Sequence, residues 1–175
     1  MNRYLIVIDM QNDFIDGALG TKEAQGIVEC VVKETEGFDG TVIFTRDTHH
    51  ADYMDTQEGK NLPILHCIEG ETGWEICKPL EIFRQSKNCR TYNKPSFGSI
   101  ELAHDMLKEH MKNPIDEICL IGLCTDICVI SNALLLKAFL PEVKISVRKN
   151  CCAGVTPESH EAALCSMSSC QIALI

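Results

Sequence analysis

Short apolar segments rich in strand-forming residues alternate along the chain with segments that are expected to be helices. The expected strands are residues 4–8, 41–45, 117–123, 143–147 and 171–175. The expected helices are residues 22–35, 100–111, 126–139 and 157–167. Strands that alternate with helices favour right-handed crossover connections. The pattern therefore predicts a three-layer α/β/α fold, with a mostly parallel central sheet between two layers of helices.

The length and composition fit one globular domain that spans residues 1–175. Hydrophobic residues make up 45% of the chain and charged residues 23%, which is typical of a folded protein. The net charge of −9 disfavours nucleic acid as a partner, and no apolar run is long enough for a membrane span. Because the N-terminal sequence lacks the pattern of a cleaved signal, we expect a cytoplasmic location.

Eleven cysteines raise the question of disulfides or metal binding. Their number is odd, several lie in apolar runs, and no export signal accompanies them. We therefore expect most of them to be small, reduced core residues.

Polar or reactive residues follow three of the expected strands. Asp9 follows the first strand, Asp47 the second, and both Cys124 and Cys128 the third. Lys94 is expected in a loop before a helix, from which it can reach the same edge of the sheet. Sheets of this kind bind ligands beyond the carboxyl ends of their strands, so these residues are candidates for a functional site.

The segment GLCTDIC crosses from a strand to a helix and places Cys128 in the first helical turn. The partial positive charge of that helix end is expected to lower the pKa of the thiol, and free N–H groups there can bind an oxyanion. Cys128 is therefore either a nucleophile or one of two packing cysteines, with Cys124 as the other. A thiol nucleophile needs a base or a cationic neighbour. No histidine is placed for this role, whereas Asp9 and Lys94 are available.

A long polar stretch follows the second strand, and long loops in compact domains are often functional. Asp47, His49, Glu58 and His66 supply two carboxylates and two imidazoles. Mixed nitrogen and oxygen donors suit Zn²⁺, Fe²⁺ or Mn²⁺. The alternative is a polar loop that contains histidines without holding a metal.

Several segments carry a resemblance to a known family, in the order LIVIDMQNDF, TRDTH, LHC, EGETGWEI, NKPSFGS, LIGLCTDICV and SHEAAL. Over nearly its whole length the chain resembles the isochorismatase-like cysteine hydrolases, and within them the nicotinamidases and pyrazinamidases. The resemblance implies a Rossmann-like α/β/α fold and a hydrolase that acts on C–N bonds of linear amides.

The resemblance also implies catalytic roles. Asp9, Lys94 and Cys128 match the catalytic triad of the family. The backbone N–H groups of Cys124 and Cys128 match its oxyanion hole, and a cis peptide bond is implied between Leu123 and Cys124.

A divalent metal cofactor is implied as well. Asp47, His49 and His66 match the metal ligands of nicotinamidases. Glu58 fits as the fourth ligand, and His50 is a spare imidazole that could compete.

The substrate pocket is implied to contain Gln11, Phe14 and Leu62, with Asp13 also beside the site. Leu62 is a departure, because nicotinamidases usually have an aromatic residue there that packs on the pyridine ring. Asn150 is another, since relatives more often have an aspartate at that position.

The expected activity is hydrolysis of a small carboxamide to an acid and ammonia, through a thioester on the cysteine. Another small amide or a carbamoyl compound is an alternative substrate, whereas isochorismatase chemistry does not need the cysteine. A noncatalytic thiol-binding or metal-binding protein is a further alternative. A receiver-like signalling domain is disfavoured, because Asp9 and Asp13 are too far apart for its acidic pair. The acidic, helix-covered exterior is compatible with a homo-oligomer.

Overall fold

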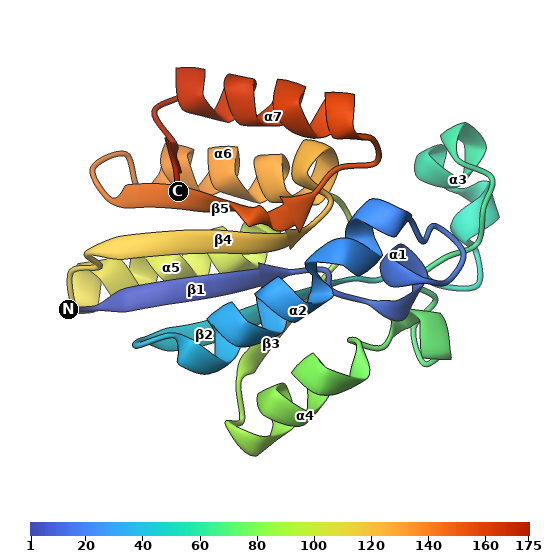
Figure 1. Cartoon of the computed structure of the whole chain (residues 1–175), viewed down its shortest axis with the longest axis horizontal. Helices are drawn as coiled ribbons and strands as arrows, with labels where there is room; N and C mark the ends of the chain where they lie inside the picture. Colours follow the sequence, from blue (N-terminus) through green and yellow to red (C-terminus); the bar gives the residue numbers. More distant parts are fainter.

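A six-stranded parallel sheet forms the centre of the computed structural model, which describes all residues 1–175 (Figure 1). The strands are β1 (Arg3–Ile8), β2 (Thr41–Asp47), β3 (Arg90–Lys94), β4 (Glu117–Leu123), β5 (Lys144–Ala153) and β6 (Ala173–Leu174). Their order is β3-β2-β1-β4-β5-β6, so the chain builds outward to β3 and then returns to the other side of β1. Ligands of such sheets bind where the winding reverses, here between β1 and β4.

Helices cover both faces of the sheet, and the predicted three-layer α/β/α fold is confirmed (Figure 1). The helices are α1 (Asn12–Ile15), α2 (Lys22–Gly37), α3 (Gln57–Asn61), α4 (Lys78–Ser86), α5 (Ile100–Lys112), α6 (Ile130–Phe139) and α7 (Pro157–Ser169). The core on one face includes residues of α1, α2 and α4, and the core on the other includes residues of α5, α6 and α7. None of the helices has the length and hydrophobicity needed to cross a membrane.

The structure differs from the sequence prediction at β3, which the pattern of apolar residues does not reveal. β3 has the polar sequence RTYNK and lies at the edge of the sheet, where only Tyr92 and Lys94 are buried. Charged side chains are common on edge strands, which need less apolar surface than central strands. Lys94 is therefore the last residue of a strand, and the prediction that it lies in a loop is wrong.

The helix predicted at residues 126–139 also begins differently. Residues Thr125–Val129 form a single π-helical turn, and the regular α6 follows it. Such turns are rare and occur frequently at functional sites. This turn carries Cys128.

β4 approaches β1 closely at Gly122. This residue has a φ of +117°, and a Cβ atom there would collide with the carbonyl oxygen of Ile8. Only glycine has this freedom of backbone and space. The close approach brings the turn that follows β4 beside Asp9, the residue after Ile8.

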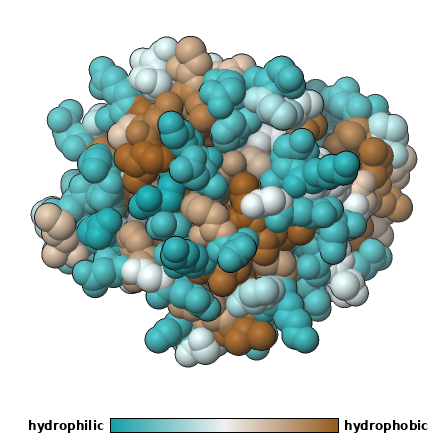
Figure 2. Space-filling model, in the orientation of Figure 1, coloured by the Kyte–Doolittle hydropathy of each residue, from teal (hydrophilic) through white to brown (hydrophobic).

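The long polar segment predicted after β2 contains α3 and two short 3₁₀ turns, Tyr53–Asp55 and Thr72–Trp74. It extends beyond the carboxyl ends of the strands, at the right of Figure 1. Figure 2 shows hydrophobic residues in several separate groups on this largely hydrophilic face, one of them at the right edge.

Nine of the eleven cysteines are free, as expected, but only five of these nine are buried in the core. Cys30 of α2 and Cys151 of β5 depart from that expectation, because they form a disulfide. The packing of α2 on β5 brings their Cα atoms to 5.5 Å, a separation at which cysteines can be bridged.

Candidate active site

Three buried side chains from distant parts of the chain meet beyond the ends of the strands. Asp9 follows β1, Lys94 ends β3, and Cys128 lies in the π-turn after β4. The Nζ atom of Lys94 lies 2.6 Å from Oδ2 of Asp9 and 3.4 Å from Sγ of Cys128. The ammonium group therefore links a carboxylate to a thiol in a site shielded from bulk water.

Thr45 of β2 fixes the orientation of the Asp9 carboxylate. Its hydroxyl donates to Oδ1 of Asp9 at 2.6 Å and accepts the backbone N–H of the same residue at 3.3 Å. Because Lys94 lies against the other oxygen, Oδ2, both carboxylate oxygens have a defined neighbour. The carboxylate is thereby aligned before any ligand arrives.

Burial and the charges of neighbouring groups determine the protonation of Asp9, Lys94 and Cys128. Burial raises the pKa of Asp9, although the charge of Lys94 opposes the shift. Burial also raises the pKa of Cys128 well above its usual value, with Lys94 again opposing. For Lys94, burial favours the neutral form, but Asp9, Cys128 and Asp47 together outweigh it and hold the pKa well above its usual value. The free site thus has a protonated thiol, an ammonium group and a carboxylate that accepts a proton readily.

The lowered pKa predicted for Cys128 from its place at a helix end is therefore wrong. Desolvation of a fully buried thiolate outweighs the partial charge of one helical turn. Removal of the thiol proton consequently requires a nearby base. Asp9 is available for this role, because Nζ of Lys94 lies 2.6 Å from its carboxylate and 3.4 Å from the sulfur of Cys128.

The turn before Cys128 presents its backbone toward the same place. The peptide bond between Leu123 and Cys124 is cis, as the family resemblance implies. The carbonyl oxygen of Cys124 accepts from the N–H groups of Ile127 and Val129, at 3.1 and 3.0 Å. The N–H group of Cys124 has no hydrogen-bond partner in the protein, so it remains available to a ligand oxygen.

Asn132, in the first turn of α6, connects this turn to the segment after Lys94. Its side-chain amide donates to the carbonyl oxygens of Cys128 at 2.8 Å and Phe97 at 3.0 Å. Its side-chain oxygen accepts the N–H of Ser99 at 2.9 Å. One buried side chain therefore fixes the position of Cys128 relative to the loop that follows Lys94.

A second group, which we call the donor cluster, lies next to the three side chains. It consists of Asp47, His49, Glu58 and His66, whose ligand atoms all lie within 4.8 Å of one another. The Nε2 atom of His49 lies 3.2 Å from Asp47 and 3.5 Å from Glu58. Lys94 joins the two groups, because its Nζ lies 3.3 Å from the other oxygen of Asp47.

The donor cluster fits a divalent metal ion. Nε2 of His49 is buried without a hydrogen-bond partner, which is costly unless a further group satisfies it. Nδ1 of His66 lies 2.8 Å from the carbonyl oxygen of Ile64, so it donates there and leaves Nε2 as a free electron-pair donor. Two imidazoles and two carboxylates make a donor set for Zn²⁺, Fe²⁺ or Mn²⁺.

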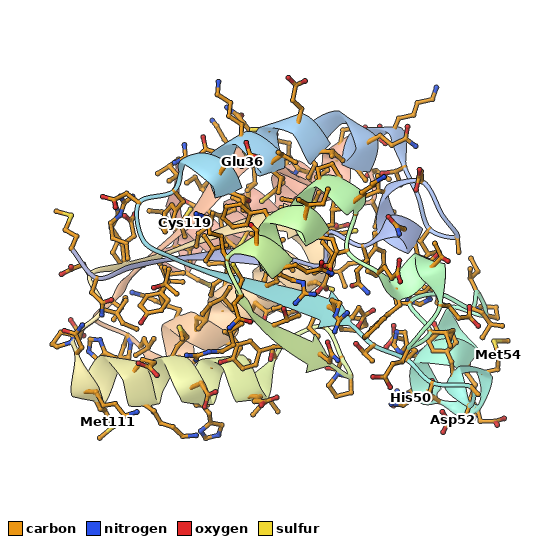
Figure 3. All side chains as sticks on the ribbon, turned by 90° about the horizontal axis from the view of Figure 1, so that it is seen from below. Glu36, His50, Asp52, Met54, Met111 and Cys119 are labelled. Carbon is orange, nitrogen blue, oxygen red and sulfur yellow. A yellow bond between two sulfur atoms is a disulfide. The ribbon has the colours of Figure 1, made fainter.

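His50 does not belong to the donor cluster. Its side chain is exposed and pairs with Glu69 at 3.5 Å. Figure 3 shows it with Asp52 and Met54 at the outer edge of the molecule. Neighbouring residues of an extended segment point in opposite directions, which explains why His49 faces inward and His50 outward.

A cavity of about 50 Å³ opens onto Cys128 and the donor cluster. Its lining is mostly hydrophobic and consists of Phe14, Leu19, Asp47, Glu58, Leu62, His66, Phe97, Cys124, Ile127 and Cys128. Phe14 and Leu62 are thus placed at the cavity, as the sequence predicts, whereas Leu19, Phe97 and Ile127 are additions.

Gln11, which the family resemblance places in the substrate pocket, is not among the residues that line this cavity. Its side chain accepts the N–H of Asp47 at 2.7 Å and donates to the carbonyl oxygens of Asp47 and Trp74, each at 2.9 Å. These bonds occupy its amide completely and hold the backbone of a donor-cluster residue. Asp13 similarly accepts the N–H of Cys67, next to His66, at 2.7 Å.

The parallel fold and the buried carboxylate, ammonium and thiol define an α/β protein with a cysteine-centred site. The chain belongs to the isochorismatase family, because the family's Isochorismatase domain matches residues 3–175. It is 30% identical over 173 residues to an uncharacterized isochorismatase family protein, PncA of Bacillus subtilis. The aligned region covers 94% of this chain and 93% of that relative.

Solved structures agree with this membership. The crystal structure of the nicotinamidase/pyrazinamidase PncA from Bacillus subtilis is similar, with a TM-score of 0.83, 30% identity and 99% of each chain covered. A pyrazinamidase of Pyrococcus horikoshii, solved in complex with zinc, has a TM-score of 0.81 and 25% identity, with 100% of this chain and 99% of that chain covered.

The hydrogen bonds of Asn132 lead to a stability prediction. Asn132→Leu keeps a side chain of similar size but leaves two buried backbone groups and a partly buried one without their partner, which should lower the free energy of unfolding by about 3 kcal/mol. Asn150→Leu, at an exposed position, is the control and should change it by less than about 0.5 kcal/mol. Urea unfolding measures both, and equal stabilities would show that Asn132 does not hold the site together.

Proposed function

We propose that this protein is a cysteine-dependent amidohydrolase, similar to nicotinamidases, which cleaves a small carboxamide to the acid and ammonia. The observation that carries the proposal is the meeting of Asp9, Lys94 and Cys128, with Cys128 lining a largely apolar cavity. A base and a cation around a thiol are what nucleophilic catalysis by cysteine requires. The nicotinamidases among the similar structures support the proposal.

In the first half of the reaction, Asp9 removes the thiol proton of Cys128, and the sulfur attacks the carboxamide carbon. A C–S bond forms, and the oxygen of the former carbonyl takes the negative charge. The N–H groups of Cys124 and Cys128 donate to that oxygen, whereas Lys94 stabilises the negative charge while it is on Asp9, before the proton transfer, and then on the sulfur, before the attack. The intermediate then loses its C–N bond, and Asp9 returns the proton to the leaving nitrogen, which departs as ammonia.

In the second half, water cleaves the thioester. Asp9 removes a proton from the water as its oxygen attacks the same carbon, and the two N–H groups again bind the oxyanion. The C–S bond breaks, the acid is released, and the sulfur regains its proton from Asp9. The raised pKa of Asp9 suits this alternation, because the group must gain and lose a proton in each half.

The proposal includes a divalent metal, Zn²⁺, Fe²⁺ or Mn²⁺, held by Asp47, His49, Glu58 and His66. When bound, the metal supplies a coordination position for a ring nitrogen of the substrate. The chain's own contribution is the orientation of these donors by Gln11 and by the backbone of the loop.

A different small amide or a carbamoyl compound is the second candidate substrate. It is favoured by Leu62, an aliphatic residue at the cavity where nicotinamidases have an aromatic partner for the ring. Ammonia release from a panel of amides and ureido acids distinguishes the two.

Replacement of the nucleophile tests the reaction. Cys128→Ala should lower kcat for ammonia release from nicotinamide on the order of 10³-fold or more, because the C–S bond cannot form. Cys124→Ala is the matched control, since the thiol of that residue forms no bond in the proposed reaction, and the variant should retain most of the activity. Comparable ammonia release from the two variants would refute the role of Cys128.

Metal content tests the donor cluster separately. After incubation with equimolar Zn²⁺ and dialysis, the unmodified protein and His50→Ala should retain about one ion per chain in elemental analysis. His66→Ala should retain almost none, because the loss of one of four ligands weakens the site severely. Equal zinc in both variants would place the metal elsewhere.

A further inference from the structure

A second, larger cavity lies next to the one above Cys128. It has a volume of about 460 Å³, against about 50 Å³ for the inner cavity. The two cavities share the lining residues Glu58, Leu62, Phe97 and Ile127. A small carboxamide whose reactive carbon reaches Cys128 fills the inner space and points its far side into the outer one.

Two residues with amide side chains, Gln57 and Asn61, line only the outer cavity. Gln57 and Asn61 lie four residues apart on α3, so their side chains project from the same side of the helix. Both residues are exposed, and neither side chain makes a hydrogen bond within the protein, so the donors and the acceptor of each amide are free to bind a ligand. The outer cavity thus combines unpaired amide groups from α3 with the apolar side chains of Leu62, Phe97 and Ile127.

Charge limits what this space can accept. Glu58 is the only charged residue in the lining, and no lysine or arginine is among the lining residues. An anionic group would lie near the Glu58 carboxylate and would find no lysine or arginine side chain to pair with. A neutral group that both donates and accepts hydrogen bonds has no such disadvantage and can satisfy both amides.

We propose that the outer cavity is a second substrate subsite and that the preferred substrates are extended carboxamides. Such a substrate carries a neutral, hydrogen-bonding substituent on the side of the molecule away from the scissile amide. Gln57 and Asn61 bind this substituent, while Leu62, Phe97 and Ile127 contact the apolar part. This inference rests on the proposed amidohydrolase function and adds the substrate class to it.

The test compares nicotinamide with its derivatives bearing a 2-hydroxyethyl or a carboxymethyl group at each free ring carbon. The two groups are similar in size, but the first is neutral and the second is anionic at neutral pH. The kcat/KM for ammonia release should be about 10-fold higher for the hydroxyethyl derivative at one or more positions than for nicotinamide. The carboxymethyl derivatives should be poorer substrates than nicotinamide at every position.

Substitutions on α3 assign the preference to the subsite. The double variant Gln57→Ala/Asn61→Ala should lower the ratio of kcat/KM between the best hydroxyethyl derivative and nicotinamide at least about fivefold, because the substituent loses its partners. Gln25→Ala, at an exposed position of α2, is the control and should keep the ratio of the unmodified protein.

Two kinds of failure are distinguishable. If nicotinamide releases ammonia but no hydroxyethyl derivative is preferred, or if the ratio is unchanged in the double variant, the subsite is refuted and the amidohydrolase function stands. If the folded, metal-loaded protein releases ammonia from none of the compounds, the amidohydrolase proposal fails, and the subsite proposal fails with it.

Discussion

The ammonium group of Lys94 is the interaction on which the site depends. It is fully buried, yet it lies within 3.4 Å of two carboxylates and a thiol, each from a different part of the chain. A buried charge is tolerated only when it is paired, so loss of either carboxylate would leave the ammonium group incompletely paired and would destabilise the fold. The same pairing raises the pKa of Lys94 and opposes the effect of burial on Asp9 and Cys128. The contacts of Lys94 therefore both stabilise the buried site and set the protonation of its reactive groups.

Sheet topology explains how these groups come together. The reversal of strand order places the ends of β1 and β4 side by side, which brings the turn of Cys128 to Asp9. Parallel pairing of β3 with β2 sets Asp47 opposite Lys94, so that one carboxylate oxygen faces the ammonium group and the other faces the donor cluster. The proposed metal and the proposed nucleophile are thus held by one continuous set of contacts, and a displacement of Asp47 would affect both.

The sequence predicts much of this arrangement because its apolar runs mark the central strands and its polar residues mark their ends. It does not reveal β3, whose polar residues suit an edge strand. It also does not reveal that the side chain of Gln11 is hydrogen-bonded to the backbone of Asp47 and Trp74. Burial of Cys128 depends on packing that no local pattern contains, so the direction of its pKa shift is also missed. Asn132 resembles any polar residue in a helix until its three partners, distant in the chain, are known.

The central claim is that the sulfur of Cys128 forms a bond to the substrate. Samples taken from the enzyme during turnover of nicotinamide, quenched in acid within milliseconds, can be digested and analysed by mass spectrometry. The account predicts that part of the peptide containing Cys128 carries the added mass of the acyl group, while peptides with the other free cysteines do not. Ammonia in the same samples, with every cysteine peptide at its unmodified mass, would contradict it.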